Sequence, residues 1–135
     1  MILTNLINGL APIEKKFNDV LINRININSK EVSPGSLFVA IKGHSNDGHS
    51  FVNDAFKNGA SAVISEKHQA SEIDKPQIIG KDTRKAVSII SSRFYDNPSK
   101  ELVIIGVTGT NGKTTTSYII KKCLSQAGLK TAQIG

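Results

Sequence analysis

The sequence has one cysteine, Cys123, and no tryptophan. A single thiol cannot build a disulfide framework or a multi-cysteine zinc site. The chain has no run of about 18 apolar residues, which a membrane-spanning helix requires. Its start, Met1 to Thr4, also lacks the basic residues that open a signal peptide. We therefore expect a soluble, cytoplasmic protein.

Acidic residues are fewer than basic ones, 11 against 17, and the net charge is +6. This balance suits an anionic partner, which could be nucleic acid, a membrane surface or a phosphorylated small molecule. Aromatic residues make up only 5% of the chain, so few side chains could stack on nucleic-acid bases. The lysines are also scattered along the sequence. We expect a small phosphorylated substrate, no nucleic-acid or membrane partner, and a monomer.

The first 99 residues alternate between short apolar runs and amphipathic segments, which is typical of an α/β domain with a largely parallel sheet. The expected strands are 20–27, 37–41, 60–64 and 77–79, and the expected helices are 51–57 and a later one that Asp82 caps. The composition becomes polar at 96–99, where Pro98 disfavours helix in the residue before it. A domain boundary is predicted near residues 97–101.

Residues 100–135 predict a second, incomplete unit. The apolar run 102–105 is expected to form a buried strand, followed by a loop, a helix to about Ala127 and a further strand in 129–134. Gly128 is expected to end the helix in a left-handed conformation, and Cys123 to lie in the core. One strand-helix-strand unit cannot cover its own sheet, so the chain is expected to be the N-terminal part of a longer protein.

The stretch from Gly106 to Thr116 contains Gly-Thr-Asn-Gly-Lys-Thr-Thr between the expected strand and helix. Such a turn directs backbone N–H groups and the positive end of the helix dipole at one point, which favours an anion. In a phosphate loop, Lys113 would contact the β- and γ-phosphates and the Thr114 hydroxyl would bind Mg²⁺. The match is partial, because Val107 stands where the usual pattern has its first glycine.

The segment Thr108 to Thr115 resembles the ATP loop of the Mur ligase superfamily, which makes amide bonds in peptidoglycan precursor synthesis and includes folylpolyglutamate synthase. Segments 27–30, 32–43, 47–51 and 58–60 resemble the N-terminal nucleotide-sugar domain of the same family. The resemblance implies an α/β fold in which residues 1–99 bind a UDP-sugar. Residues 100–135 would then begin the central ATP-binding domain, as the first strand-loop-helix-strand unit of a P-loop ATPase-type fold.

The resemblance also implies roles for individual residues. Ile27 and Ser29 would contact the uridine end of the substrate, and the loop of His44, Ser45 and Asn46 would hold its uracil or diphosphate. ATP would be bound by Gly109, Thr110, Asn111, Gly112, Lys113, Thr114 and Thr115, with Lys113 as the catalytic residue and Thr114 as the Mg²⁺ ligand. The sequence departs from the family pattern Asp-Ser-Arg at Asn28 and Lys30, and lysine lacks the fork geometry of arginine.

The implied activity is ATP-dependent addition of a third residue, diaminopimelate or lysine, to UDP-N-acetylmuramoyl-L-alanyl-D-glutamate through an acyl phosphate. These 135 residues alone are expected to be inactive. Three alternatives stay open: a sister ligase that adds a dipeptide or extends folate, a phosphate-binding regulatory module without chemistry, and a nucleic-acid binder. Because His44, His49 and His68 have no cysteine or paired carboxylate at ligand spacing, they are expected to be loop or surface residues, with His44 the strongest exception.

Overall fold

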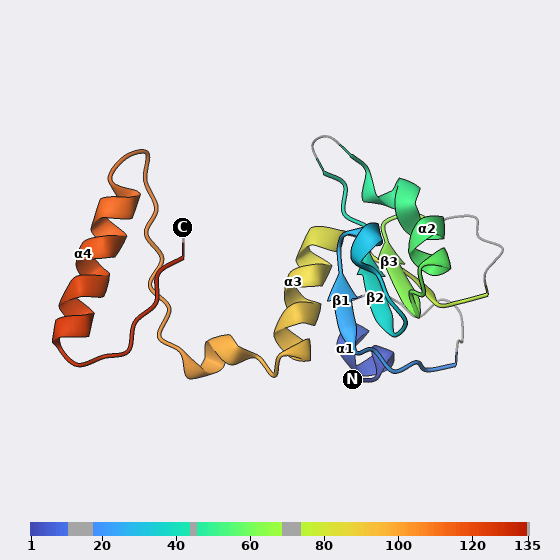
Figure 1. The fold of residues 1–135 in the computed structure, drawn as a ribbon, viewed down its shortest axis with the longest axis horizontal. Helices are drawn as coiled ribbons and strands as arrows, with labels where there is room; N and C mark the ends of the chain where they lie inside the picture. Colours follow the sequence, from blue (N-terminus) through green and yellow to red (C-terminus); the bar gives the residue numbers. More distant parts are fainter. Residues whose placement is uncertain (11–17, 44–45, 69–73, 135) are drawn as a thin grey trace. The chain divides into compact units, whose positions relative to one another are not determined.

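The computed structural model describes residues 1–10, 18–43, 46–68 and 74–134. The chain divides into two compact units, Met1–Pro98 and Ser99–Gly135. The first contains a sheet with helices and the second is built around one long helix (Figure 1).

The sheet of the first unit is wholly parallel and runs in chain order β1-β2-β3-β4. The strands are β1 Arg24–Asn26, β2 Ser36–Val39, β3 Ala62–Ser65 and β4 Gln77–Ile79. Leu37 is aligned with Ile25 on one side and with Ala62 on the other. The predicted α/β class with parallel pairing is confirmed, although the first strand is shorter than the expected 20–27 and Ile27 is exposed.

Helices cover both faces of this sheet because side chains alternate between the faces along each strand. On β2, Leu37 and Val39 belong to the core shared with helices α1 (Leu3–Ile7) and α3 (Thr83–Phe94). Phe38, between them, belongs to the opposite core, which helix α2 (Val52–Lys57) covers. All four residues of β2 are buried, as expected for a strand with helices on both sides.

Local signals in the sequence explain where these elements begin and end. The Asp82 carboxylate accepts a hydrogen bond from the Lys85 amide at 2.9 Å, so it caps α3 as predicted. Gly59 follows α2 with φ +106°, a left-handed conformation that side chains other than glycine rarely adopt. Two short 3₁₀ turns, η1 (Ser29–Glu31) and η2 (Gly48–Phe51), follow β1 and β2. They hold the ends of these strands in place.

The second unit contains the helix α4 (Lys113–Gln126), preceded by the short turn η3 (Pro98–Glu101). Gly128 has φ +84°, and the amides of Gly128 and Leu129 bond back to Ser125 and Leu124, a Schellman end of the predicted kind. The two flanking segments run beside α4 (Figure 1). The side-chain amide of Gln133 donates to the Ser117 hydroxyl at 2.8 Å, and this bond holds the C-terminal segment beside α4.

Three expectations for this unit were wrong. The segment 102–105 is neither a strand nor buried, since Val103 is 94% exposed, and 129–134 also lacks strand pairing among the described residues. An apolar run becomes a buried strand only when neighbours pair with it and cover it, and no such neighbour is found in the described part of this unit. Cys123 is exposed rather than in a core for the same reason, because α4 has no buried residue.

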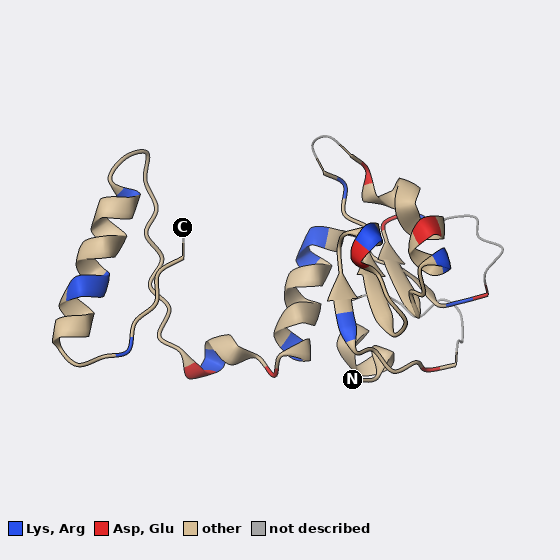
Figure 2. Ribbon diagram, viewed as in Figure 1, with Lys and Arg blue, Asp and Glu red and all other residues tan. Residues whose placement is uncertain are grey.

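No helix in the described ranges is both long enough and apolar enough to cross a bilayer. Lysine and arginine occur on α2, α3, α4 and the loops (Figure 2), which agrees with the scattered pattern read from the sequence.

Candidate nucleotide site

Three of the predicted uridine-binding residues follow the carboxyl ends of two neighbouring parallel strands. Ile27 lies directly after β1 and is 60% exposed, and Ser29 opens the η1 turn that follows. Asn46 lies in the connection after β2, the neighbouring strand. In open parallel sheets, ligands bind at this edge. His44 and Ser45 lie outside the described residues.

The connection after β2 folds back on itself at defined positions. Lys42 and Asp47 form an antiparallel bridge, and the Gly43 amide donates to the Asn46 carbonyl at 2.9 Å. The Gly48 amide donates to the Ile41 carbonyl at 3.0 Å. A side chain at Gly48 would place its Cβ only 2.6 Å from that carbonyl oxygen, so the close return of the chain requires glycine.

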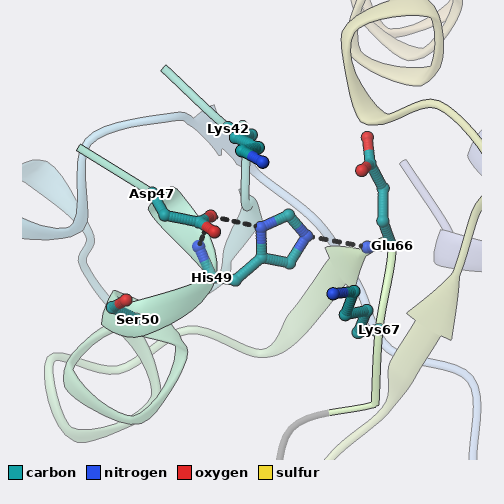
Figure 3. A pocket seen from close by; sticks show the side chains of 6 residues that line it. All are labelled: Lys42, Asp47, His49, Ser50, Glu66 and Lys67. Carbon is teal, nitrogen blue, oxygen red and sulfur yellow. Dashed lines mark hydrogen bonds and ion pairs between the residues drawn. The ribbon is translucent and has the colours of Figure 1, made fainter. Parts of the chain in front are cut away.

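A hollow of about 310 Å³ lies between this connection and the end of β3. Its lining is mostly charged or polar and consists of Lys42, Asp47, His49, Ser50, Glu66 and Lys67 (Figure 3). The His49 ring lies between the Asp47 carboxylate and the Glu66 backbone. Its Nδ1 is 2.5 Å from Asp47 Oδ1, and its Nε2 accepts a hydrogen bond from the Glu66 amide at 2.9 Å.

The contacts of Asp47 keep it ionised. Its Oδ1 also accepts a bond from the His49 amide at 3.0 Å, and this bond, then the His49 side chain, lower the pKa of the carboxyl below its usual 3.8. His49 was expected to be a loop or surface residue. It lies in the loop region, yet its side chain is only 10% exposed. No group of three or more His, Cys, Asp or Glu residues within the described ranges could hold a metal.

Glu66 continues this network toward α3. Its Oε1 accepts hydrogen bonds from the amide and the hydroxyl of Thr83, both at 3.1 Å. Thr83 is the first residue of α3, where unpaired N–H groups favour a carboxylate. Arg84, the next residue of the helix, donates to the Lys42 carbonyl at 2.9 Å. The loop after β2, the end of β3 and the start of α3 are therefore joined by side chains.

Asn28, one of the two departures from the family pattern, has a local structural role. The Asn28 side chain accepts a bond from the Lys30 amide at 3.1 Å and donates to the Glu31 carboxylate at 2.9 Å. Asn28 thereby caps η1, a task that asparagine and aspartate both perform. The Ser29 carbonyl accepts a bond from the side-chain amide of Asn58 at 3.0 Å, which ties this turn to the end of α2.

In the second unit, the predicted phosphate loop leads into the N-terminus of α4. Gly112 is the N-cap with φ +76°, and Gly109 has φ +149°, so both glycines adopt conformations that other residues avoid. No side chain caps the helix and its first turn has no acidic residue. Its leading N–H groups are therefore open to an anion. The loop residues 109–115 are all exposed.

The Lys113 side chain folds back onto the loop that precedes α4. Its Nζ donates to the Gly109 carbonyl at 2.7 Å and to the Thr110 carbonyl at 3.4 Å. The ammonium group is thus held on the loop side of the helix end, in the region that the leading N–H groups face. Thr114 is the second residue of the helix, and its exposed hydroxyl is an oxygen donor of the type that Mg²⁺ accepts.

Comparison with known proteins identifies the family. The profile described as "Mur ligase family, catalytic domain" matches residues 21–103, more than half of the chain. The chain belongs to the Mur ligase family. The match covers the whole parallel sheet of the first unit.

Curated relatives extend the Mur ligase match over the rest of the chain. The chain is 43% identical over 137 residues to the UDP-N-acetylmuramoyl-L-alanyl-D-glutamate--2,6-diaminopimelate ligase of Bacillus velezensis, covering 100% of this chain and 28% of the relative. The protein of the same name from Aquifex aeolicus is 49% identical over 114 residues, or 84% of this chain and 23% of its own length. The chain therefore spans about a quarter of the curated relatives it matches.

Solved structures agree on the fold. The MurF ligase of Thermotoga maritima in complex with ADP matches with a TM-score of 0.59 and 34% identity over 82% of this chain and 25% of that one. MurF from Acinetobacter baumannii matches with a TM-score of 0.59 and 30% identity. Both share the fold of this chain over about a quarter of their own length.

Sequence reasoning missed several residues of the edge described above. Glu66 and Lys67 were assigned no role, Lys42 was included only in a segment that resembles the family, and His49 was expected to be a loop or surface residue. Glu66 and Lys67 directly follow an apolar strand, and charged residues at the carboxyl end of a buried parallel strand could have drawn attention to this edge.

Proposed function

We propose that this chain is the uridine-nucleotide domain and the beginning of the ATP-binding domain of an ATP-dependent amide ligase. The proposed reaction adds the third residue, diaminopimelate or lysine, to UDP-N-acetylmuramoyl-L-alanyl-D-glutamate, which is the activity of the ligase called MurE. The observation that carries this proposal is the glycine loop that opens α4 without a side-chain cap. This loop lies in a chain whose whole length aligns with 28% of a UDP-N-acetylmuramoyl-L-alanyl-D-glutamate--2,6-diaminopimelate ligase.

The uridine end of the substrate is assigned to the carboxyl edge of the parallel sheet. Ile27 offers an exposed apolar surface and Ser29 a hydroxyl, and Asn46 lies on the neighbouring loop. We assign His44 and Ser45 to the same loop on the strength of the family resemblance alone. Binding at this edge would hold the substrate far from its reacting carboxylate, so that the affinity serves to position that group.

The ATP site is assigned to residues 109–115. A carboxylate is a poor acyl donor until a phosphoryl group converts it to an acyl phosphate, which an amine then attacks to release phosphate. The loop amides and the Lys113 ammonium would stabilise negative charge on the transferred phosphoryl group. Lys113 would exchange its two carbonyl acceptors for phosphate oxygens.

The donor set of the loop fits a magnesium ion held mainly by nucleotide phosphates and water, since Thr114 supplies one hydroxyl and the first turn of α4 no carboxylate. Mg²⁺ bound there would neutralise charge on the β- and γ-phosphates. We further propose that the protein acts in the cytoplasm as a monomer, on UDP-N-acetylmuramoyl-dipeptide and an amino acid. These 135 residues alone should have negligible ligase activity.

ATP binding tests the second unit. Titration of the ¹⁵N-labelled chain with ATP and Mg²⁺ should shift the amide signals of residues 109–115, and Lys113→Ala should weaken binding at least tenfold. Lys130→Ala is the matched control, because Lys130 is an exposed lysine of the same unit outside the loop. Unchanged affinity in Lys113→Ala, or shifts that avoid the loop, would remove the ATP assignment.

Substrate protection tests the first unit. UDP-N-acetylmuramoyl-dipeptide should raise the melting temperature of the chain and shift the amides of Ile27, Ser29 and Asn46, whereas a folate should do neither. Protection by the folate alone would favour the sister enzyme that extends folate. Oligonucleotide binding that falls steeply with salt, without any response to the uridine nucleotide, would favour a nucleic-acid binder.

A further inference from the structure

His49 links two strand ends through both nitrogens of its ring. Nδ1 lies 2.5 Å from Asp47 Oδ1 in the loop after β2, and Nε2 lies 2.9 Å from the Glu66 amide after β3. The His49 side chain is 10% exposed, whereas its partner Asp47 is 46% exposed, and both bonds lie at the protein surface. Figure 3 shows the ring bridging the two segments.

The chemistry of these partners selects one protonation form. A backbone amide can only donate, so Nε2 must present its lone pair to Glu66. The remaining proton of a neutral ring then lies on Nδ1, where it is donated to the Asp47 carboxylate. The other neutral tautomer would leave Nδ1 without a proton for Asp47 and point a proton at the Glu66 amide. The doubly protonated ring would keep the first bond and lose the second.

We propose that His49 is a positioning residue of the uridine-nucleotide site, whose neutral Nδ1-protonated ring holds the loop after β2 against the end of β3 until acidification releases it. This rests on the proposed function, because that loop includes Asn46. Glu66 extends the same support to α3 through Thr83.

Charged groups line the hollow around the ring. The Asp47 carboxylate is bonded to Nδ1, and the ammonium groups of Lys42 and Lys67 line the same hollow. The Glu66 carboxylate is engaged with Thr83, and Arg84 approaches only the Lys42 carbonyl. A proton added at Nε2 faces the Glu66 amide, which is itself a donor, so protonation of Nε2 breaks this bond.

Two substitutions separate the two bonds. His49→Asn can place its amide nitrogen near the former Nδ1 and keep a donor for Asp47, but it loses the acceptor for Glu66. His49→Gln can place its amide oxygen near the former Nε2 and keep that acceptor, but it loses the donor for Asp47. His68→Gln is the matched control, since His68 is exposed and lies outside the hollow.

The readouts are the ¹⁵N shifts of the imidazole, the protection of the Glu66 amide from hydrogen exchange, and the affinity for UDP at pH 7.5 and pH 5. We expect the Nδ1-protonated tautomer at pH 7.5. At pH 7.5, the protection of the Glu66 amide from exchange should fall at least tenfold in His49→Asn but not in His49→Gln. In the unsubstituted chain it should fall by the same factor between pH 7.5 and pH 5. Each His49 variant should bind UDP about three- to tenfold more weakly at pH 7.5, the loss of one hydrogen bond, and His68→Gln should bind normally.

An Nε2-protonated ring at pH 7.5, or Glu66 protection that is unchanged in His49→Asn, would overturn the linkage. Normal UDP affinity in both His49 variants would overturn the positioning role. If the unsubstituted chain binds UDP neither at pH 7.5 nor at pH 5, the proposed function fails and the positioning role fails with it. In that case the tautomer and exchange data still decide whether His49 holds the loop.

Discussion

Replacement of Gly48 by alanine should destabilise the first unit through one backbone contact. The new Cβ would lie 2.6 Å from the Ile41 carbonyl oxygen and 2.7 Å from the Ile41 nitrogen. Both are backbone atoms, so neither can move aside as a flexible side-chain tip would. The φ of Gly48 is outside the left-handed region, so the effect isolates this contact from backbone strain.

The size of the effect follows from two contributions. Forcing an extra carbon into a filled space costs about 1–3 kcal/mol. Separating the two segments also weakens the bond from the Gly48 amide to the Ile41 carbonyl, now 3.0 Å, and such bonds contribute about 0.5–1.5 kcal/mol. A loss of about 2 kcal/mol would lower the melting temperature of a unit of this size by roughly 8–16 °C.

Urea unfolding, followed by circular dichroism, measures this loss directly. Gly80→Ala is the control, because its Cβ would meet only the Ile64 side chain at 3.9 Å, an ordinary contact. Gly80→Ala should leave the free energy of unfolding unchanged or slightly raised, since alanine restricts the unfolded chain. If Gly48→Ala were as stable as Gly80→Ala, the loop after β2 would not return to Ile41 as described.

Three further predictions concern the first unit. Arg93→Met should lower the free energy of unfolding by about 2 kcal/mol, because Arg93 donates to the Leu6 and Asn8 carbonyls, both at 2.7 Å, and Arg93→Lys should lose less. Asp82→Ala should cost about 1 kcal/mol as a lost helix cap, and Asp82→Ser should restore most of it. Folding lowers the pKa of the Asp47 carboxyl below 3.8, so the ionised carboxylate should stabilise the folded state fully above pH 3.8. This stabilisation should disappear as the pH falls through the lower pKa of the folded state. Acid unfolding of Asp47→Asn should therefore lack this pH-dependent loss of stability.

The sheet could be predicted because its information is local. The run after Ser36 is apolar at every position, a pattern typical of a strand covered on both faces, and its burial as β2 confirms this. Asp82 and Gly128 likewise mark helix ends through chemistry that needs no distant partner. Turns and caps of this kind are encoded in a few neighbouring residues.

Expectations that required a distant partner were less successful. The run 102–105 has the composition of a buried strand, but pairing and cover must come from other segments, and the described residues supply neither. Cys123 was assigned to a core by the same reasoning and is exposed. His49 shows the opposite case, because it was expected in a loop or at the surface and its side chain is mostly buried. Its partner Glu66 is 17 residues away, a separation that periodicity and motif spacing do not reveal.

The two assigned nucleotide sites differ in the groups that shape them, which are backbone amides in one site and titratable side chains in the other. The loop before α4 is shaped by Gly109 and Gly112, and its donors are backbone amides, so its affinity for phosphate should change little with pH in the range where histidine titrates. The loop after β2 is held by the side chains of Asp47 and His49, so its shape is sensitive to protonation. Acidification to pH 5 should consequently weaken UDP binding while ATP binding is retained, and equal losses at both sites would mean that the whole chain, rather than this one loop, responds to the proton.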